Sequence, residues 1–402
     1  ALAAASVANA VAFWKDTTFQ ALAITACLLA GWIGAGEAAA ARFGATAGAT
    51  TSPARAAFAA LAPTGGGQPG PFLVTCGLVC LTSSGVAVAR ARRWNTVQEP
   101  RRRAGAAPGR GGTRRGRRDV WRNPVLWREI CTRAHGRTML LVRLGWLLLF
   151  AVALAGVAAE ARSARPDRLA VAVAVVPMAL ASLLAVTAMA VTSVTIERDR
   201  GTFDLLLVSD LEPAEFVWGK LLGVLAAARE IVILPLVLCG AVVAAGIATP
   251  EHGLYLALGL AVLLFFAAVL GLYAGLSHPV SRRAIAVALG TVAFLFVGVA
   301  TAMRIMVAFG ASFELQLAPF LAVIVGGAIG LYAALSARNP SPAVGWASAL
   351  LPALTFVAIT GFLQGSTLQV FLVVCCAYGF ATLALLVPAI GAFDLLTGRS
   401  GG

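Results

Sequence analysis

Charged residues are scarce in this sequence, and acidic residues are the scarcer kind. Only 12% of the 402 residues are charged, and aspartate and glutamate together number 17. A soluble globular domain has about 25% charged and about 45–50% apolar residues, whereas 60% of this chain is hydrophobic. So few charges are not enough to cover the water-facing surface of a soluble protein. The composition therefore excludes that class and indicates that lipid surrounds most of the chain.

The residues that build catalytic and metal centres are also missing or dispersed. The chain has three scattered histidines, and none of its seven cysteines forms a CxxC pair, which argues against a zinc site or a disulfide framework. It contains no GxxxxGK[ST] phosphate loop and no HExxH motif. No histidine lies within a long apolar run, where it would be needed to activate a serine. We therefore predict that the chain is not an enzyme and binds no metal or cofactor itself.

Apolar residues, by contrast, occur in long runs. A transmembrane helix needs about 20 predominantly apolar residues, and the chain has ten runs of about this length or longer. We predict an all-α polytopic membrane protein with about ten transmembrane helices. The predicted spans are 17–36, 71–90, 139–158, 169–194, 226–247, 254–276, 284–307, 318–336, 343–362 and 368–390.

Arginine is concentrated in residues 90–137. This stretch holds fifteen arginines and three acidic residues, so its net charge of +12 accounts for most of the net +14 of the chain. Basic loops stay on the cytoplasmic side of the membrane. Alternation of the spans then places 195–225, 277–283, 337–342 and both termini on that side. We predict a multi-pass protein of the cell inner (plasma) membrane with both termini cytoplasmic.

The first part of this basic stretch has no hydrophobic periodicity. Residues 99–118 read EPRRRAGAAPGRGGTRRGRR, which predicts a disordered, self-repelling linker that we assign to 91–119. Arginine-rich runs attract phosphate, but no folded nucleic-acid module and no aromatic stacking platform accompanies this one. The expected partner is therefore anionic membrane lipid and not nucleic acid.

The second part of the basic stretch, 120–137, has the pattern of a helix. Asn123 is a cap residue and Pro124 suits the first helical position. Leu126 and Ile130 share one side at helical spacing, which predicts an amphipathic helix in the headgroup plane, with a plain cytoplasmic helix as the alternative. Trp127 is predicted beside that apolar side, and Arg128 and Glu129 are predicted on the rest of the helix surface.

A polar stretch at 195–220 differs from an ordinary loop between spans. Four charges of alternating sign at 197–200 end a span, and Gly201 then breaks the helix. An apolar piece, TFDLLLV, follows at 202–208, and a second helix begins near Pro213. Such an element presents an apolar tip with a charged rim, which is typical of a docking surface for a soluble partner. A re-entrant or surface-lying helix without a partner is the alternative.

The sequence ERDRGTFDLLLVSDLEPAEFVWGKLLG, from residue 197, resembles the signature of permease subunits of ATP-binding-cassette exporters of the second bacterial type. It contains the family's acidic-basic pair, Gly-Thr, hydrophobic run with an acidic residue, Ser, Pro and Gly-Lys. The segment NPVLWREI, 123–130, resembles the interfacial connecting helix of the same family. The resemblance covers about residues 120–336.

The resemblance implies a function and its partners. The chain is expected to pair with a second permease subunit, as a homo- or heterodimer, and to bind a separate ATP-binding-cassette ATPase subunit. ATP and Mg²⁺ are expected on that ATPase subunit. Its closure on ATP would push the coupling element and move the packed helices as rigid bodies, driving export across the membrane.

The resemblance also implies roles for single residues of the coupling element. Gly201 and Thr202 match the family's Gly-Thr pair within the coupling element. The apolar contact with the ATPase is assigned to Phe203, Leu205, Leu206 and Leu207. Orientation by charge is assigned to Glu197, Arg198, Asp199, Arg200, Asp204 and Asp210.

The pattern suggests four parts. They are an N-terminal membrane segment with two spans (1–90), the basic linker (91–119), a six-span permease core (120–336) and a C-terminal two-span extension with a tail (337–402). A membrane scaffold or assembly factor that docks a soluble ATPase without transport is the alternative function. A secondary carrier is disfavoured, because no internal repeat is evident and the charges cluster at span ends.

Three ionisable residues near span starts are open to more than one interpretation. Arg143 lies a few residues into a span and is expected to snorkel to the cytoplasmic surface. Arg229 and Glu230 lie near the cytoplasmic start of another span, where they either face the interface or pair with other helices.

Overall fold

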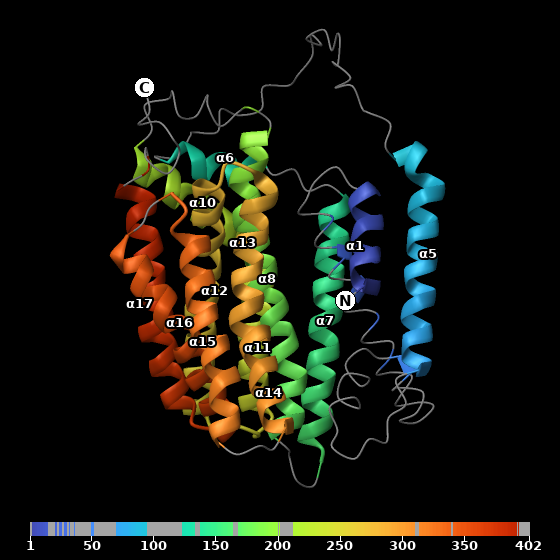
Figure 1. The fold of residues 1–402 in the computed structure, drawn as a ribbon, viewed down its shortest axis with the longest axis vertical. Coiled ribbons are helices and arrows are strands. Elements are labelled where there is room, and N and C mark those ends of the chain that lie inside the picture. Colours follow the sequence, from blue (N-terminus) through green and yellow to red (C-terminus); the bar gives the residue numbers. More distant parts are fainter. Residues whose placement is uncertain are drawn as a thin grey trace.

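The chain forms a bundle of long helices in the computed structural model (Figure 1). The described residues are 2–14, 70–94, 123–132, 137–163, 168–199, 201, 212–309, 313–338, 341–391 and 393, with single residues and pairs between 21 and 51. Within these ranges the chain contains no strand. Eight of the described helices are long and apolar enough to cross a membrane, and a bent pair of helices is a candidate for a ninth span. An all-α polytopic membrane protein is thereby confirmed.

Most predicted spans coincide with a helix, whereas the first, 17–36, falls largely outside the described residues. The matching helices are α5 (Gly70–Trp94), α7 (Arg137–Ala161), α8 (Arg168–Asp199), α12 (Pro250–Ser277), α15 (Phe313–Leu335), α16 (Pro342–Gln364) and α17 (Thr367–Gly391). One further span is a continuous helix with a π-helical turn in the middle, made of α13 (Ser281–Ala293), η1 (Phe294–Gly298) and α14 (Val299–Phe309).

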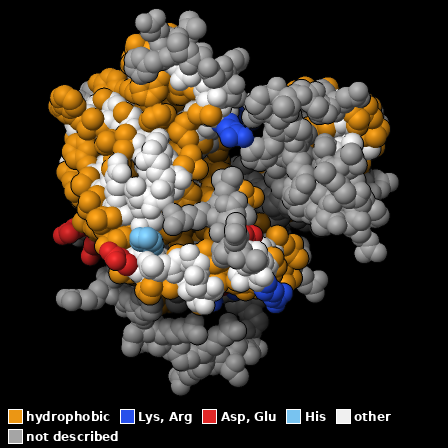
Figure 2. All heavy atoms as spheres, turned by 90° about the horizontal axis from the view of Figure 1, so that it is seen from below, with side chains coloured by type: hydrophobic (Ala, Val, Ile, Leu, Met, Phe, Trp, Pro, Cys, Tyr) orange, Lys and Arg blue, Asp and Glu red, His pale blue; other side chains and the backbone are white. Residues whose placement is uncertain are grey.

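The short helix α6 (Pro124–Thr132) lies across one end of the bundle, at the top of Figure 1, and we call this the α6 end. The same end holds the last turns of α8, α12 and α15 and the first turns of α10, α13 and α16. Hydrophobic side chains cover most of the described surface seen from the opposite end (Figure 2). An apolar outer surface is expected of helices that face lipid.

Helix α12 is the centre of the bundle and is buried along most of its second half. It packs closely on α8, because Gly271 and Gly275 carry no side chain there. A Cβ atom added at Gly271 would lie 2.6 Å from the carbonyl oxygen of Thr187. Helix α17 packs on another side of α12, and α16 packs on α17. The two C-terminal helices are therefore part of the same bundle as the helices of 120–336.

The predicted helix near Pro213 and the predicted span 226–247 correspond to α10 (Pro213–Ala227) and α11 (Arg229–Ala244). The two helices meet at Ala228 with a bend of 62°, and together they are the candidate for the ninth span. The charged residues Arg229 and Glu230 follow this point directly. The physical reason for the bend lies at the α6 end, where α10 is bound to α6 by the contacts described below.

Helix α1 (Leu2–Trp14) packs mainly on α5. The hydroxyl of Ser83 in α5 donates a hydrogen bond to the hydroxyl of Ser6 in α1, at 2.8 Å. In Figure 1, α5 stands at the edge of the molecule, beyond α1 and α7.

Candidate functional site

Helix α6 begins where the sequence predicts. The Oδ1 atom of Asn123 accepts a hydrogen bond from the backbone N–H of Leu126 at 2.9 Å, and Pro124 is the first helical residue. The Nδ2 atom of Asn123 donates to the carbonyl oxygen of Glu215 in α10 at 2.8 Å. Asn123 therefore caps α6 and also joins it to the first turn of α10. The position of α6 in the headgroup plane stays a prediction.

Two glycines of α10 let α6 approach its backbone. A Cβ atom added at Gly219 would lie 2.8 Å from Oδ1 of Asn123 and 2.9 Å from Cβ of Val125. A Cβ atom added at Gly223 would lie 2.6 Å from Cβ of Glu129. These distances are shorter than any ordinary carbon contact, so the packing of α6 on α10 requires glycine at both positions.

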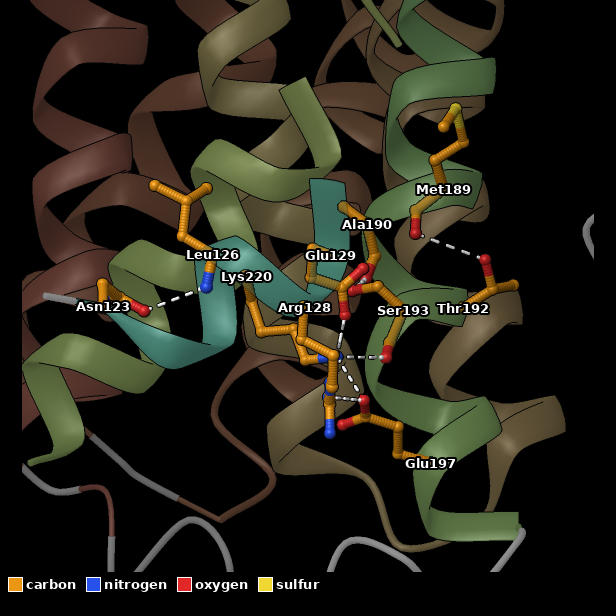
Figure 3. Close-up of polar contacts among 10 residues, drawn as sticks. All are labelled: Asn123, Leu126, Arg128, Glu129, Met189, Ala190, Thr192, Ser193, Glu197 and Lys220. Atoms are coloured by element: carbon orange, nitrogen blue, oxygen red, sulfur yellow. Dashed lines mark hydrogen bonds and ion pairs between the residues drawn. The ribbon is translucent and has the colours of Figure 1, made fainter. Parts of the chain in front are cut away.

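Lys220 lies between the two glycines and is completely buried. Its Nζ atom lies 2.6 Å from Oε1 of Glu129 in α6 and 2.6 Å from Oε1 of Glu197 at the end of α8. The same ammonium donates a hydrogen bond to the carbonyl oxygen of Ser193 in α8 at 3.1 Å. Figure 3 shows the lysine side chain pointing to these three oxygens.

Arg128 completes the group. Its Nη2 atom contacts Oε1 of Glu197 and lies 3.8 Å from Oε1 of Glu129 (Figure 3). We call Arg128, Glu129, Glu197 and Lys220 the charge cluster. It contains two positive and two negative side chains, so its formal charge is zero.

The charge cluster stabilises the α6 end only as a unit. A buried ammonium without partners costs several kcal/mol of solvation free energy. Here Lys220 has three oxygen acceptors, and Glu129 is only 7% exposed. Loss of Lys220 removes the buried ammonium that the carboxylates of Glu129 and Glu197 share. The charge cluster therefore joins three elements, α6, α8 and α10, in a defined geometry.

The burial of Glu129 corrects part of the sequence interpretation. The helical pattern placed the apolar side of α6 at Leu126 and Ile130, with Glu129 on the rest of the helix surface. In the structure the side that faces α10 contains Val125, 3% exposed, and Glu129. Hydrophobic periodicity could not find this side, because it includes a carboxylate whose partner is 91 residues away.

The other two charges at the end of α8 bind within the chain as well. The guanidinium of Arg198 donates to the carbonyl oxygens of His278 and of Leu276, the latter at 3.3 Å. These oxygens lie at the C-terminal end of α12, where a cation is favourable. Asp199 accepts a hydrogen bond at 2.5 Å from the hydroxyl of Ser281, the first residue of α13.

His278 is buried between these elements. Its Nδ1 atom lies 3.3 Å from the carbonyl oxygen of Ala274. Burial lowers the pKa of His278 below its ordinary 6.5, and the positive charges of Arg283, Arg338 and Arg198 lower it further. The imidazole is therefore neutral at pH 7.

Gly201 ends this part of the chain in the left-handed region, with φ of 68°. Its backbone N–H donates to the carbonyl oxygen of Arg198 at 3.0 Å. The turn predicted at this glycine is therefore present. The other predicted coupling residues lie outside the described residues, and they are Arg200, Thr202, Phe203, Asp204, Leu205, Leu206, Leu207 and Asp210.

Lys220 is the site residue that the sequence interpretation used least. It entered only as the last residue of a motif. A charged residue inside the otherwise apolar helix sequence VWGKLLGVLAA is itself a signal, because a buried lysine requires a carboxylate. That signal predicts a partner but does not identify Glu129 or Glu197.

Comparison with known proteins gave no matching family model, no matching curated protein and no matching solved structure. The family resemblance therefore rests on the motif residues of the sequence alone.

Proposed function

We propose that this chain is the permease subunit of an ATP-binding-cassette transporter of the exporter type, with the α6 end facing the cytoplasm. A separate ATPase subunit binds ATP and Mg²⁺ and docks at residues 202–210. A second permease subunit completes the membrane part. In this arrangement the basic stretch 90–137 also lies in the cytoplasm, where its arginines meet anionic lipid.

The observation that carries this proposal is the convergence of the motif's charged residues. Glu197 at one end of the motif and Lys220 at the other are in contact, and both are bound to the helix that resembles the family's connecting helix. The segment between them, 202–210, is therefore attached at both ends to a charge-paired base. A force on this segment acts on α6, α8 and α10 together.

The geometry divides the roles of the coupling residues. Glu197, Arg198 and Asp199 bind α10, α12 and α13 respectively, so we assign them to the base of the element. The apolar side chains of 203–207 are assigned to the ATPase contact, as the resemblance implies. Charge at the base then sets the direction in which the apolar tip points.

Purification of the full chain with its ATPase from native membranes tests the proposal. Leu206→Asp places a charge in the proposed contact, and the complex should lose the ATPase and its stimulated hydrolysis. Leu254→Asp is the matched control, because Leu254 is 56% exposed near the opposite end and should leave both unchanged. Wild-type yield of ATPase and wild-type hydrolysis in Leu206→Asp would overturn the proposal.

A second measurement separates a transporter from a scaffold. Transport requires rearrangement of the end opposite α6 when ATP is bound. In the purified complex, ATP should change the rate at which a thiol reagent labels Leu254→Cys. An unchanged rate, with the ATPase bound and active, favours the scaffold.

A further inference from the structure

The bend at Ala228 divides one apolar stretch into two arms. Hydrogen bonding continues through it, because the N–H of Ala228 donates to the oxygen of Val224 at 2.8 Å and its own oxygen accepts from Val232 at 2.9 Å. The backbone of Ala228 has φ of −93° and ψ of 14°, so ψ departs clearly from the helical value and the bend of 62° is located at this residue. Contacts of the two arms with other helices can then stabilise one angle of the bend.

The first arm, α10, is bound to α6 and α8. Lys220 supplies the ion pairs, and the first turn accepts the hydrogen bond from Asn123. Helix α10 is also the main packing partner of α6. We therefore expect α10 to move together with α6 and the end of α8.

The second arm, α11, is bound to a different helix by a different ion pair. Oε1 of Glu230, two residues after the bend, lies 3.4 Å from Nε of Arg143 in α7. The two side chains are 27% and 29% exposed. Glu230 also lies 3.1 Å from Nε of Arg229, but that arginine belongs to the same helix and is 63% exposed. Of these two ion pairs, the one with Arg143 links α11 to another helix, α7, on which α11 also packs.

The snorkelling expected of Arg143 stays a prediction, and the structure adds a partner. Arg143 is within ion-pair distance of a carboxylate on a neighbouring helix, which agrees with the alternative that Glu230 pairs with other helices. An ion pair that is largely shielded from water is screened less than one on the surface. The pair is therefore suited to fix the position of one helix relative to another.

We propose that the Arg143–Glu230 pair sets the angle at Ala228 and so transmits displacement of α10 to α7 and α11. Transmission rests on the proposed function, because the displacement originates where the ATPase docks. The setting of the angle does not depend on any partner. Arg143 and Glu230 are positioning residues, with no contact to ATP or to a transported molecule.

Distance measurement across the bend tests this inference on the full chain alone. Spin labels are attached in a cysteine-free background at Leu222→Cys on α10 and Leu148→Cys on α7, which are 45% and 67% exposed. The parent chain in lipid nanodiscs should give one narrow distance distribution. Glu230→Gln should shift or broaden it. The double reversal Arg143→Glu with Glu230→Arg should restore a narrow distribution.

Arg229→Gln is the matched control, because it removes the neighbour of Glu230 without touching the link to α7. It should leave the distribution unchanged. An unchanged distribution in Glu230→Gln, or an equal change in Arg229→Gln, overturns the inference. If Glu230→Gln does not give a monodisperse protein, Arg143→Gln is measured in its place. If neither single variant folds, folding of the double reversal supports the pair and its failure overturns it.

This outcome is separate from that of the docking experiment. A changed distance in Glu230→Gln together with wild-type ATPase binding in Leu206→Asp supports the role of the Arg143–Glu230 pair and rejects the proposed function. An unchanged distance in Glu230→Gln together with loss of the ATPase in Leu206→Asp supports the proposed function and rejects the role of the pair.

Discussion

The ammonium of Lys220 lies 2.6 Å from the carboxylate of Glu129, which precedes it by 91 residues. Both side chains are buried, and the contact joins the helix before the first core span to the helix before the bend. Five predictions concern this end of the molecule.

Removal of the lysine charge should destabilise the chain strongly. Lys220→Met leaves Glu129 and Glu197 close together, and loss of one partner from a buried ion pair costs about 3–5 kcal/mol. Thermal unfolding in detergent, followed by tryptophan fluorescence, should show a clearly lowered midpoint.

Neutralising the two carboxylates should recover much of this loss. The triple variant Lys220→Met, Glu129→Gln, Glu197→Gln no longer contains buried carboxylates, and replacement of a whole buried ion pair is often close to neutral. A triple variant as unstable as Lys220→Met alone would contradict the assignment of the charge cluster.

Close packing of α6 on α10 should make Gly223 intolerant of a side chain. In Gly223→Ala the new methyl group meets Cβ of Glu129, and overpacking of this kind costs about 1–3 kcal/mol. Gly240→Ala, in α11, is the control. Nothing lies within 4 Å of its added Cβ, so it should be neutral or stabilising by up to about 1 kcal/mol. Equal unfolding midpoints for the two variants would argue against the α6–α10 contact.

The sequence predicts the helices of this region but not the contacts between them. Long spans such as Pro250–Ser277 follow directly from apolar composition, and the start of α6 follows from Asn123 and Pro124. Contacts between Glu129, Glu197 and Lys220 depend on how helices pack, which sequence separation does not encode. The charges at 197–199 were predicted to orient the coupling element, and their contacts with neighbouring helices could be found only in the structure. Alanine is a good helix former, so the only local signal of the bend at Ala228 is the charged pair Arg229 and Glu230 beside it.

Replacement of Gly201 by alanine should affect coupling to the ATPase more than it affects stability. Alanine in the left-handed region costs about 1–2 kcal/mol, and Gly201→Ala should lower partner-stimulated ATP hydrolysis because it alters the start of the coupling segment. Gly246→Ala is the control, because Gly246 has φ of 72° at the opposite end and also has open space around it. It should lose similar stability and keep hydrolysis. Equal hydrolysis in both variants would separate Gly201 from coupling.

Stability should fall at mildly acid pH because of His278. Its pKa is lowered in the folded chain by burial and by nearby arginines, while the unfolded chain protonates near pH 6.5. The unfolded state therefore binds more protons between the lowered pKa and 6.5, and stability decreases as the pH falls through this window. His278→Gln should flatten that part of the curve of unfolding midpoint against pH. A curve identical to that of the parent chain would rule out this histidine as the cause.

The order of the charge cluster along the chain has a consequence for biogenesis. Glu129 and Glu197 are both synthesised before Lys220, and Arg128 is the only cation of the cluster that precedes it. A nascent chain that has not yet reached residue 220 therefore lacks the ammonium that Glu129 and Glu197 share. The contact that joins α6 to the end of α8 through Lys220 can form only after α10 has been synthesised, so this end of the bundle is completed late in synthesis.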